Sequence, residues 1–176
     1  MRRKLHCPLV SKLVDRGPGS HFRGQIQRTR TLTSMTDLKL IALDSEDLDV
    51  ISATTQDAIV RVGDMGFAKA DKRFALLMNR YAWEDGKAGK AGIRKRAALH
   101  FDHVASVKVA GIDTNSVEGA LELLTIRFTQ GEAPSGWIDL AFAGGGTVRL
   151  EVDVLEARLA DLGSAWAAKA KPEHAA

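Results

Sequence analysis

The chain has 176 residues, of which 45% are apolar and 27% charged, a composition ordinary for one soluble domain with its own core. Its single cysteine, Cys7, excludes a cysteine zinc site, an iron–sulfur cluster and a thiol nucleophile from the rest of the chain. No apolar run is long enough for a membrane helix or a secretory signal, so we expect a cytoplasmic protein.

The net charge of +3 is distributed unevenly. Residues 1–34 hold eight Lys and Arg and one acidic residue, Asp15, whereas the remaining chain holds 17 basic and 21 acidic residues. This first segment lacks a helix or strand period and contains Gly17-Pro18-Gly19-Ser20. We expect a disordered extension or a misassigned start, with Met35 as the true one. An Arg-rich organellar targeting peptide and a nucleic-acid-binding arm are alternatives.

After the extension, residues 35–166 read as a single globular domain and residues 167–176 as a frayed tail. Residues 38–43 predict a short strand. Asp44-Ser45-Glu46-Asp47 then supplies the cap and first-turn chemistry of a helix. The apolar stripe of that helix is modest: Leu48, Ile51 and Ala58.

The strongest strand patterns flank a Gly- and Lys-rich connection. Residues 74–83 are rich in apolar and aromatic side chains, which favours a well-covered strand. Residues 93–101 alternate at period two. One face carries Ile93, Ala97, Leu99 and Phe101, with Lys95 as the exception, and the other carries Arg94, Arg96 and His100.

Further strands are predicted at residues 59–62, 104–110, 121–128, 137–142 and 148–152. Asp153 can cap a closing helix that carries Leu155, Leu159 and Leu162 and ends at Gly163. The sequence therefore predicts an α+β fold. Its sheet would be mostly antiparallel, a strongly bent sheet or partly open barrel of seven to eight short strands with one early and one C-terminal helix. By architecture alone this resembles the pleckstrin-homology-like barrels, which implies no function.

Four segments also carry a resemblance to a known family: residues 36–43, 73–84, 99–102 and 148–163. They are similar to an uncharacterised alphaproteobacterial family known only as a domain of unknown function. The resemblance covers about residues 35–166 and leaves residues 1–34 unmatched. It implies a bacterial protein, and it implies no activity, ligand or catalytic residue.

One cluster of side chains suggests a binding surface. Its basic residues are Lys87, Lys90, Arg94, Lys95 and Arg96, and Tyr81 and Trp83 lie just upstream. Arginine binds phosphate through two parallel hydrogen bonds and an aromatic ring can stack on a base, so a nucleotide or RNA site fits these residue types. The alternative is a solvated loop and an edge strand kept soluble by positive charge.

Other candidate residues carry less chemistry. His100 and Asp102 share a strand face, but His103 points away, so we expect no metal site. Gly144-Gly145-Gly146 reads as a hairpin turn, because neither the Lys-Ser/Thr nor the helix of a phosphate loop follows it. Trp137 and Trp166 read as lids over the core.

Two functional hypotheses follow. The first is a non-catalytic binding module in which Arg94 and Arg96, with Tyr81, Trp83 and His100, contact an anionic partner: a protein, a nucleotide or RNA. The alternative is a small enzyme with His100 and Asp102 as an acid/base pair. No cofactor, metal or membrane is expected in either. A free strand edge is compatible with a homodimer.

Overall fold

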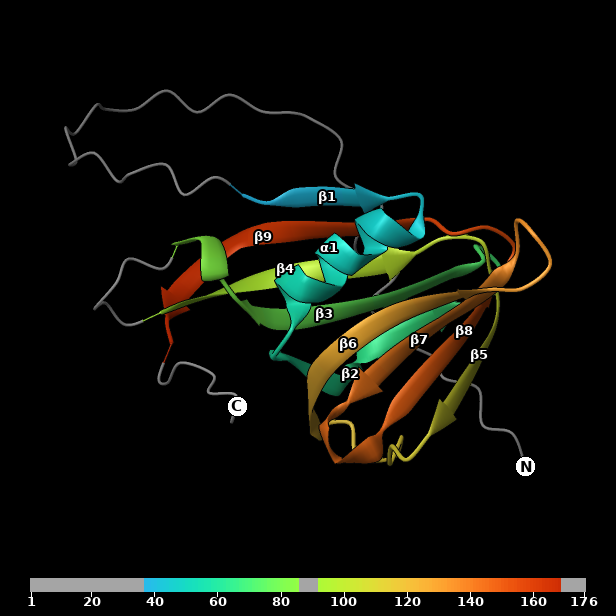
Figure 1. The fold of residues 1–176 in the computed structure, drawn as a ribbon. Coiled ribbons are helices and arrows are strands. Elements are labelled where there is room, and N and C mark those ends of the chain that lie inside the picture. Colours follow the sequence, from blue (N-terminus) through green and yellow to red (C-terminus); the bar gives the residue numbers. More distant parts are fainter. Residues whose placement is uncertain (1–36, 86–91, 169–176) are drawn as a thin grey trace, which may run out of the picture.

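The computed structural model describes residues 37–85 and 92–168 (Figure 1). The predicted extension at residues 1–34 lies outside the described residues, as does nearly all of the predicted tail. Lys87 and Lys90, two members of the predicted basic cluster, also lie outside them.

Nine strands and one α-helix make up the described chain. In order they are β1 (Lys39–Ala42), α1 (Ser45–Thr55), β2 (Ala58–Ala68), β3 (Arg73–Tyr81), β4 (Ile93–Phe101), β5 (Val104–Ala110), β6 (Ala120–Gln130), β7 (Gly136–Phe142), β8 (Thr147–Val152) and β9 (Ala157–Ala167). Two single 3-10 turns, η2 (Trp83–Asp85) and η3 (Ala143–Gly145), follow β3 and β7.

All nine strands form one sheet in the order β1-β9-β4-β3-β2-β6-β7-β8-β5. Every neighbouring pair is antiparallel, as predicted. β1 and β5 are the two edges, so the sheet is not closed. Figure 1 shows that the β1-β9-β4-β3 half and the β6-β7-β8-β5 half turn toward each other, with α1 lying across the inside of the bend.

The predicted helix start is confirmed. The Asp44 side chain accepts a hydrogen bond from the backbone N–H of Asp47 at 2.8 Å and caps α1. In the last turn the hydroxyls of Thr54 and Thr55 donate to carbonyl oxygens one turn earlier. Ala58 does not belong to the helix stripe, because the helix ends at Thr55 and Ala58 begins β2.

The core lies on the inner face of the bend, under α1. Leu48 and Ile51 of α1 are fully buried there, together with alternate residues of the strands. On β3 and β4 these alternate residues are Phe74, Leu76, Met78, Ala97, Leu99 and Phe101. The opposite face of β3 and β4 is the outer face of the sheet, and the candidate site lies there.

The predicted C-terminal helix is wrong, because residues 157–167 form β9. Leu155 and Leu159 are four residues apart, a spacing that fits one face of a helix and also one face of a strand. The intervening Ala157 is buried with them, whereas Leu162 is 42% exposed, which is the strand pattern. Gly163, the predicted helix stop, has φ +73 and lies in an irregularity of the β4–β9 ladder.

The fold class is corrected accordingly. With β9 and one helix, the protein is a mostly antiparallel, nine-stranded open sheet rather than an α+β fold of seven to eight strands. The comparison with pleckstrin-homology-like barrels depended on a closing helix, so it does not hold. The predicted hairpin turn at Gly144 and Gly145 is confirmed: η3 joins β7 to β8, and both glycines have positive φ.

Candidate binding face on strand β4

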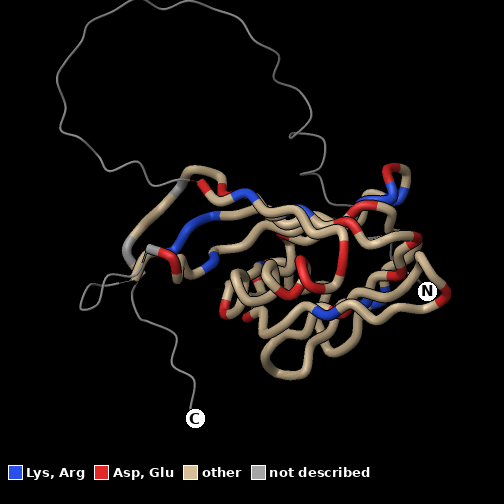
Figure 2. Tube along the Cα trace, turned by 45° about the horizontal axis from the view of Figure 1, so that its top comes forward, with Lys and Arg blue, Asp and Glu red and all other residues tan. Residues whose placement is uncertain are grey.

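Strand β4 separates its charges between two faces. Arg94, Arg96 and His100 are partly exposed on the outer face, as the period-two pattern predicts, while Lys95 lies among the buried residues of the inner face at 3% exposure. Figure 2 shows the Lys and Arg run of β4 as a continuous blue stretch of the trace. Only Arg94 and Arg96 of this run are available to an outer-face ligand.

Backbone carbonyls hold Arg94 in place. Its Nη1 donates to the carbonyl oxygens of Asp57 at 3.2 Å and Asn79 at 3.0 Å. Asp57 has φ +60 directly before β2, which is the backbone turn that brings its carbonyl to this face. A carbonyl oxygen carries no net charge, so these bonds orient the guanidinium without cancelling its charge.

Arg96 and His100 have acidic neighbours at longer distances. Arg96 Nη2 lies 3.5 Å from Asp64 Oδ2, with the two side chains 38% and 14% exposed. His100 Nε2 lies 3.5 Å from Asp102 Oδ2. Burial lowers the pKa of His100, and the charges of Arg73 and Arg158 lower it further against the opposing effect of Asp102. His100 is therefore held in its neutral form.

Tyr81 and Trp83 lie beside Arg94 but differ in their exposure to solvent. Their ring centroids are 4.4 Å apart, with the planes tilted by 50°. Tyr81 is only 4% exposed, because its ring covers Gly92, where any side chain would overlap it. Trp83 is 38% exposed. Of the two predicted stacking residues, Trp83 is thus the accessible one and Tyr81 supports it.

Trp166 is a member of this face that the sequence analysis did not assign. It pairs directly with Arg94 across the β4–β9 ladder, so the two side chains project from the same side of the sheet. It is 41% exposed, and Trp137 is 40% exposed, so neither is the core lid that we predicted. The sequence does not assign Trp166 to this face because it predicts a closing helix that ends at Gly163, with Trp166 after it, rather than a strand beside β4.

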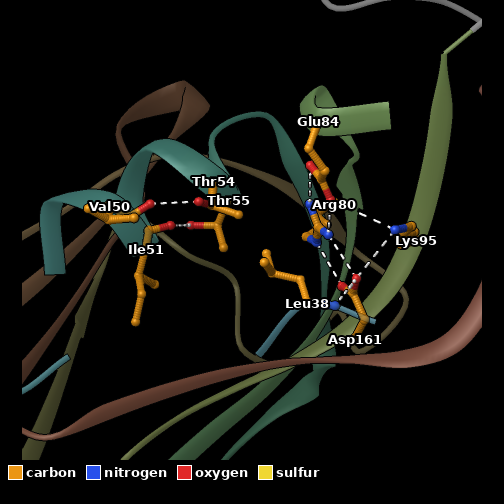
Figure 3. Close-up of polar contacts among 9 residues, drawn as sticks. All are labelled: Leu38, Val50, Ile51, Thr54, Thr55, Arg80, Glu84, Lys95 and Asp161. Carbon is orange, nitrogen blue, oxygen red and sulfur yellow. Dashed lines mark hydrogen bonds and ion pairs between the residues drawn. The ribbon is translucent and has the colours of Figure 1, made fainter. Parts of the chain in front are cut away.

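The inner face beneath this site holds a buried ion cluster (Figure 3). Arg80 of β3 is fully buried, and it donates to Asp161 of β9 through Nε and Nη2 at 2.8 Å each. It also donates to both carboxylate oxygens of Glu84, at 3.1 and 2.6 Å. Lys95 Nζ lies 3.8 Å from Glu84 and 3.7 Å from Asp161. These two carboxylates stabilise the Lys95 ammonium group on the inner face, which explains why a lysine can occupy an otherwise apolar position of β4.

The cluster shifts the pKa of each carboxyl group. Burial alone would raise the pKa of Asp161, but hydrogen bonds from Arg80 and from the backbone N–H of Leu38, with the charges of Arg80 and Lys95, lower it. The pKa of Glu84 is lowered by the same balance of burial against Arg80 and Lys95. Arg80 in turn has a raised pKa, because its bonds to Asp161 and Glu84 outweigh its burial. Arg80, Glu84 and Asp161 are thus each stabilised in their charged forms.

The residues considered for metal or acid/base chemistry are tied into ion pairs. Arg73 Nε donates to Asp102 Oδ1 at 2.5 Å, which occupies the carboxylate beside His100. His103 Nε2 lies 3.2 Å from Glu156 Oε2. Within residues 37–85 and 92–168, no group of three or more His, Cys, Asp and Glu side chains is arranged to hold a metal ion.

Taken together, the fold and its outer face define a curved antiparallel-sheet protein with a mixed cationic and aromatic surface. Residues 38–174 match the model of the family described as "Protein of unknown function (DUF2948)", and the chain belongs to that family. The family description gives no activity, ligand or partner. No curated protein and no solved structure matches the chain. In the part of the chain that the structure describes, no helix is long and apolar enough to cross a membrane.

Proposed function

We propose that the protein is a non-catalytic binding module whose outer face, at Arg94 and Arg96, contacts an anionic partner. The observation that carries this is the environment of Arg94: the guanidinium is oriented by two backbone carbonyls and keeps its charge at a partly exposed position. A preoriented arginine loses less side-chain entropy when it binds a carboxylate or phosphate. Arg96 adds a second cation about 7 Å further along β4, two residues at about 3.4 Å each.

Charge reversal tests this proposal. The full chain carrying Arg94→Glu and Arg96→Glu is titrated with a labelled polyanion, heparin, at several salt concentrations and followed by fluorescence anisotropy. We expect weaker binding and a shallower dependence of log K on log salt, because fewer counterions are released.

The matched control reverses two cations on the other half of the sheet, Arg127 of β6 and Lys108 of β5, both of which are exposed. Arg127→Glu with Lys108→Glu changes the net charge by the same amount. If both double variants lose affinity equally, binding reflects overall charge and the proposed face is wrong.

The enzyme alternative receives less support. His100 and Asp102 do lie together, 3.5 Å apart, but Asp102 is already bound by Arg73 and the pKa of His100 is lowered. A carboxylate neutralised by an arginine orients and activates a histidine base poorly. We therefore keep the binding module as the proposed function, acting in the cytoplasm of a bacterium. Detection of the native protein in a cytoplasmic fraction would check that placement.

A further inference from the structure

Aromatic side chains collect at one end of the outer face. The chain has three Trp and one Tyr. Three of these four, Tyr81, Trp83 and Trp166, lie around Gly92 and Arg94. Tyr81 and Trp166 are the cross-strand partners of Arg94 from its two sides, so they share its face, and the Trp83 ring contacts Tyr81.

Two of the three rings are accessible to a ligand. Trp83 and Trp166 are 38% and 41% exposed, whereas Tyr81 is buried under Trp83 and against Gly92. Indole rings left open on a sheet face are apolar surfaces that a flat ring can cover. The Trp83 ring, in the turn η2, packs against Tyr81, which in turn packs against Gly92. Trp166 belongs to β9, which is hydrogen-bonded to β4. Both accessible rings are therefore held by neighbouring structure.

The cations lie along β4 beside these rings. Arg94 and Arg96 are two residues apart on the same face, about 7 Å by the rise of a strand. That interval is comparable to the separation of successive phosphates in an extended single strand. Proteins that bind single strands combine such a cationic track with aromatic rings on which successive bases stack.

We propose that this face binds single-stranded nucleic acid, with phosphates on Arg94 and Arg96 and unpaired bases stacked on Trp83 and Trp166. The inference rests on the proposed function and names its ligand class. An acidic peptide would satisfy the two arginines but offers no planar bases for the two indoles. A duplex keeps its bases stacked on one another and cannot use the indoles either.

The test uses the two tryptophans as reporters. In the full chain with Trp137→Phe, a substitution on the other half of the sheet, the remaining fluorescence comes from Trp83 and Trp166. Titration with a short unstructured oligouridylate is expected to quench this fluorescence as bases stack. Adding Trp166→Ala is expected to weaken binding by about 5- to 150-fold, the usual range for loss of one base–aromatic stack.

Two controls make the readout specific. The variant with Trp83→Phe and Trp166→Phe keeps Trp137 as its only indole, and its fluorescence should not respond to the oligonucleotide. Heparin, which has charge but no bases, should bind without quenching. The basic segment at residues 1–34 is the same in every variant and holds no Trp, so a difference between variants comes from the substituted residues.

The outcomes separate the two proposals. Quenching by the oligouridylate, absent with heparin and with a duplex of equal length, supports the nucleic-acid face. If heparin binding depends on Arg94 and Arg96 but the oligonucleotide neither quenches nor loses affinity in the Trp166→Ala variant, this inference is overturned and the proposed function stands. If the Arg94→Glu, Arg96→Glu variant binds heparin and the oligouridylate as tightly as the wild type does, both the proposed function and this inference are overturned.

Discussion

Arg80 and Asp161 are 81 residues apart in sequence, and each of two nitrogens of Arg80 donates to a different oxygen of Asp161. The strands that carry them, β3 and β9, are not neighbours, because β4 runs between them. The ion pair therefore spans β4 on the inner face, where Lys95 of β4 lies close to the same carboxylate. Three strands are held together by charges that water does not reach.

Replacing Asp161 with Asn should destabilise the fold strongly. The substitution leaves Arg80 and Lys95 as buried cations with one fewer carboxylate, and breaking a buried pair from one side typically costs about 3–5 kcal/mol. Urea unfolding followed by circular dichroism measures the change in the free energy of unfolding. Asp139→Asn, which removes a carboxylate from an exposed pair with Arg149, is the control and should leave the urea midpoint nearly unchanged.

Removing both partners should cost less than removing one. With Arg80→Met and Asp161→Leu together, no buried charge of this pair remains, so the double variant is expected to be more stable than Asp161→Asn. A double variant that is less stable than the single one would show that the pair itself supplies the stability. That result would contradict the account in terms of unpaired buried charge.

The same cluster predicts acid sensitivity. The pKa of Asp161 is lowered in the folded state, so its contribution to stability is present above the unfolded-state pKa of about 3.9 and is lost as the pH falls through the folded value. Urea midpoints of the wild type should therefore drop steeply between about pH 5 and pH 2. The Asp161→Asn variant should show a shallower slope in this window, and equal slopes would exclude Asp161 as the cause.

His100 predicts a second, milder pH effect in the same direction. Burial lowers its pKa in the folded state, so below about pH 6.5 the unfolded chain binds more protons than the folded one at this site. Stability should accordingly decline as the pH falls from about 7 toward 5. His100→Gln, which cannot be protonated, is expected to flatten that decline in thermal melts at each pH. A slope identical to the wild type would be evidence against a half-buried histidine whose pKa is lowered in the folded state.

Gly92→Ala should disturb the aromatic end of the outer face. An added Cβ at this position overlaps the ring of Tyr81, and forcing extra atoms into a packed site typically costs about 1–3 kcal/mol. The substitution should cost less when Tyr81 has first been changed to Leu, which a double-mutant cycle of urea midpoints measures. Additive effects in the cycle would mean that Gly92 and Tyr81 do not constrain each other.

Most strands could be predicted because their pattern is local. In β8 apolar and polar residues alternate without interruption, and in β4 they alternate with Lys95 as the exception on the apolar face. Both strands have their predicted residues within one position. The start of α1 was equally readable, since a cap and its first turn involve only neighbouring residues. For such elements the sequence alone is sufficient.

β9 could not be distinguished from a helix by the same means. Leu159 of β9 and Leu155, two residues before the strand, have a spacing common to both structures, and Gly163 fits a helix end as well as a ladder irregularity. What decides in favour of the strand is pairing with β1 and β4, segments far away in the sequence. Tertiary pairing of this kind outweighs a local ambiguity.

The site was predicted in part for a related reason. Alternation along β4 placed Arg94 and Arg96 on one face and Lys95 on the other. The partner that makes Lys95 tolerable, Asp161, and the ring that joins Arg94, Trp166, both belong to β9. Without the register between β4 and β9, neither could be assigned from the chain.

The position of β9 also bears on when the protein can fold as it is synthesised. β9 is the last described strand to leave the ribosome, yet it lies inside the sheet between β1 and β4, next to the earliest strand. Until it emerges, Arg80 and Lys95 lack the carboxylate of Asp161, and β1 has no strand to pair with. A nascent chain ending at β8 therefore presents an open strand edge and two cations facing an unfinished core, a species that depends on chaperones more than the completed chain does.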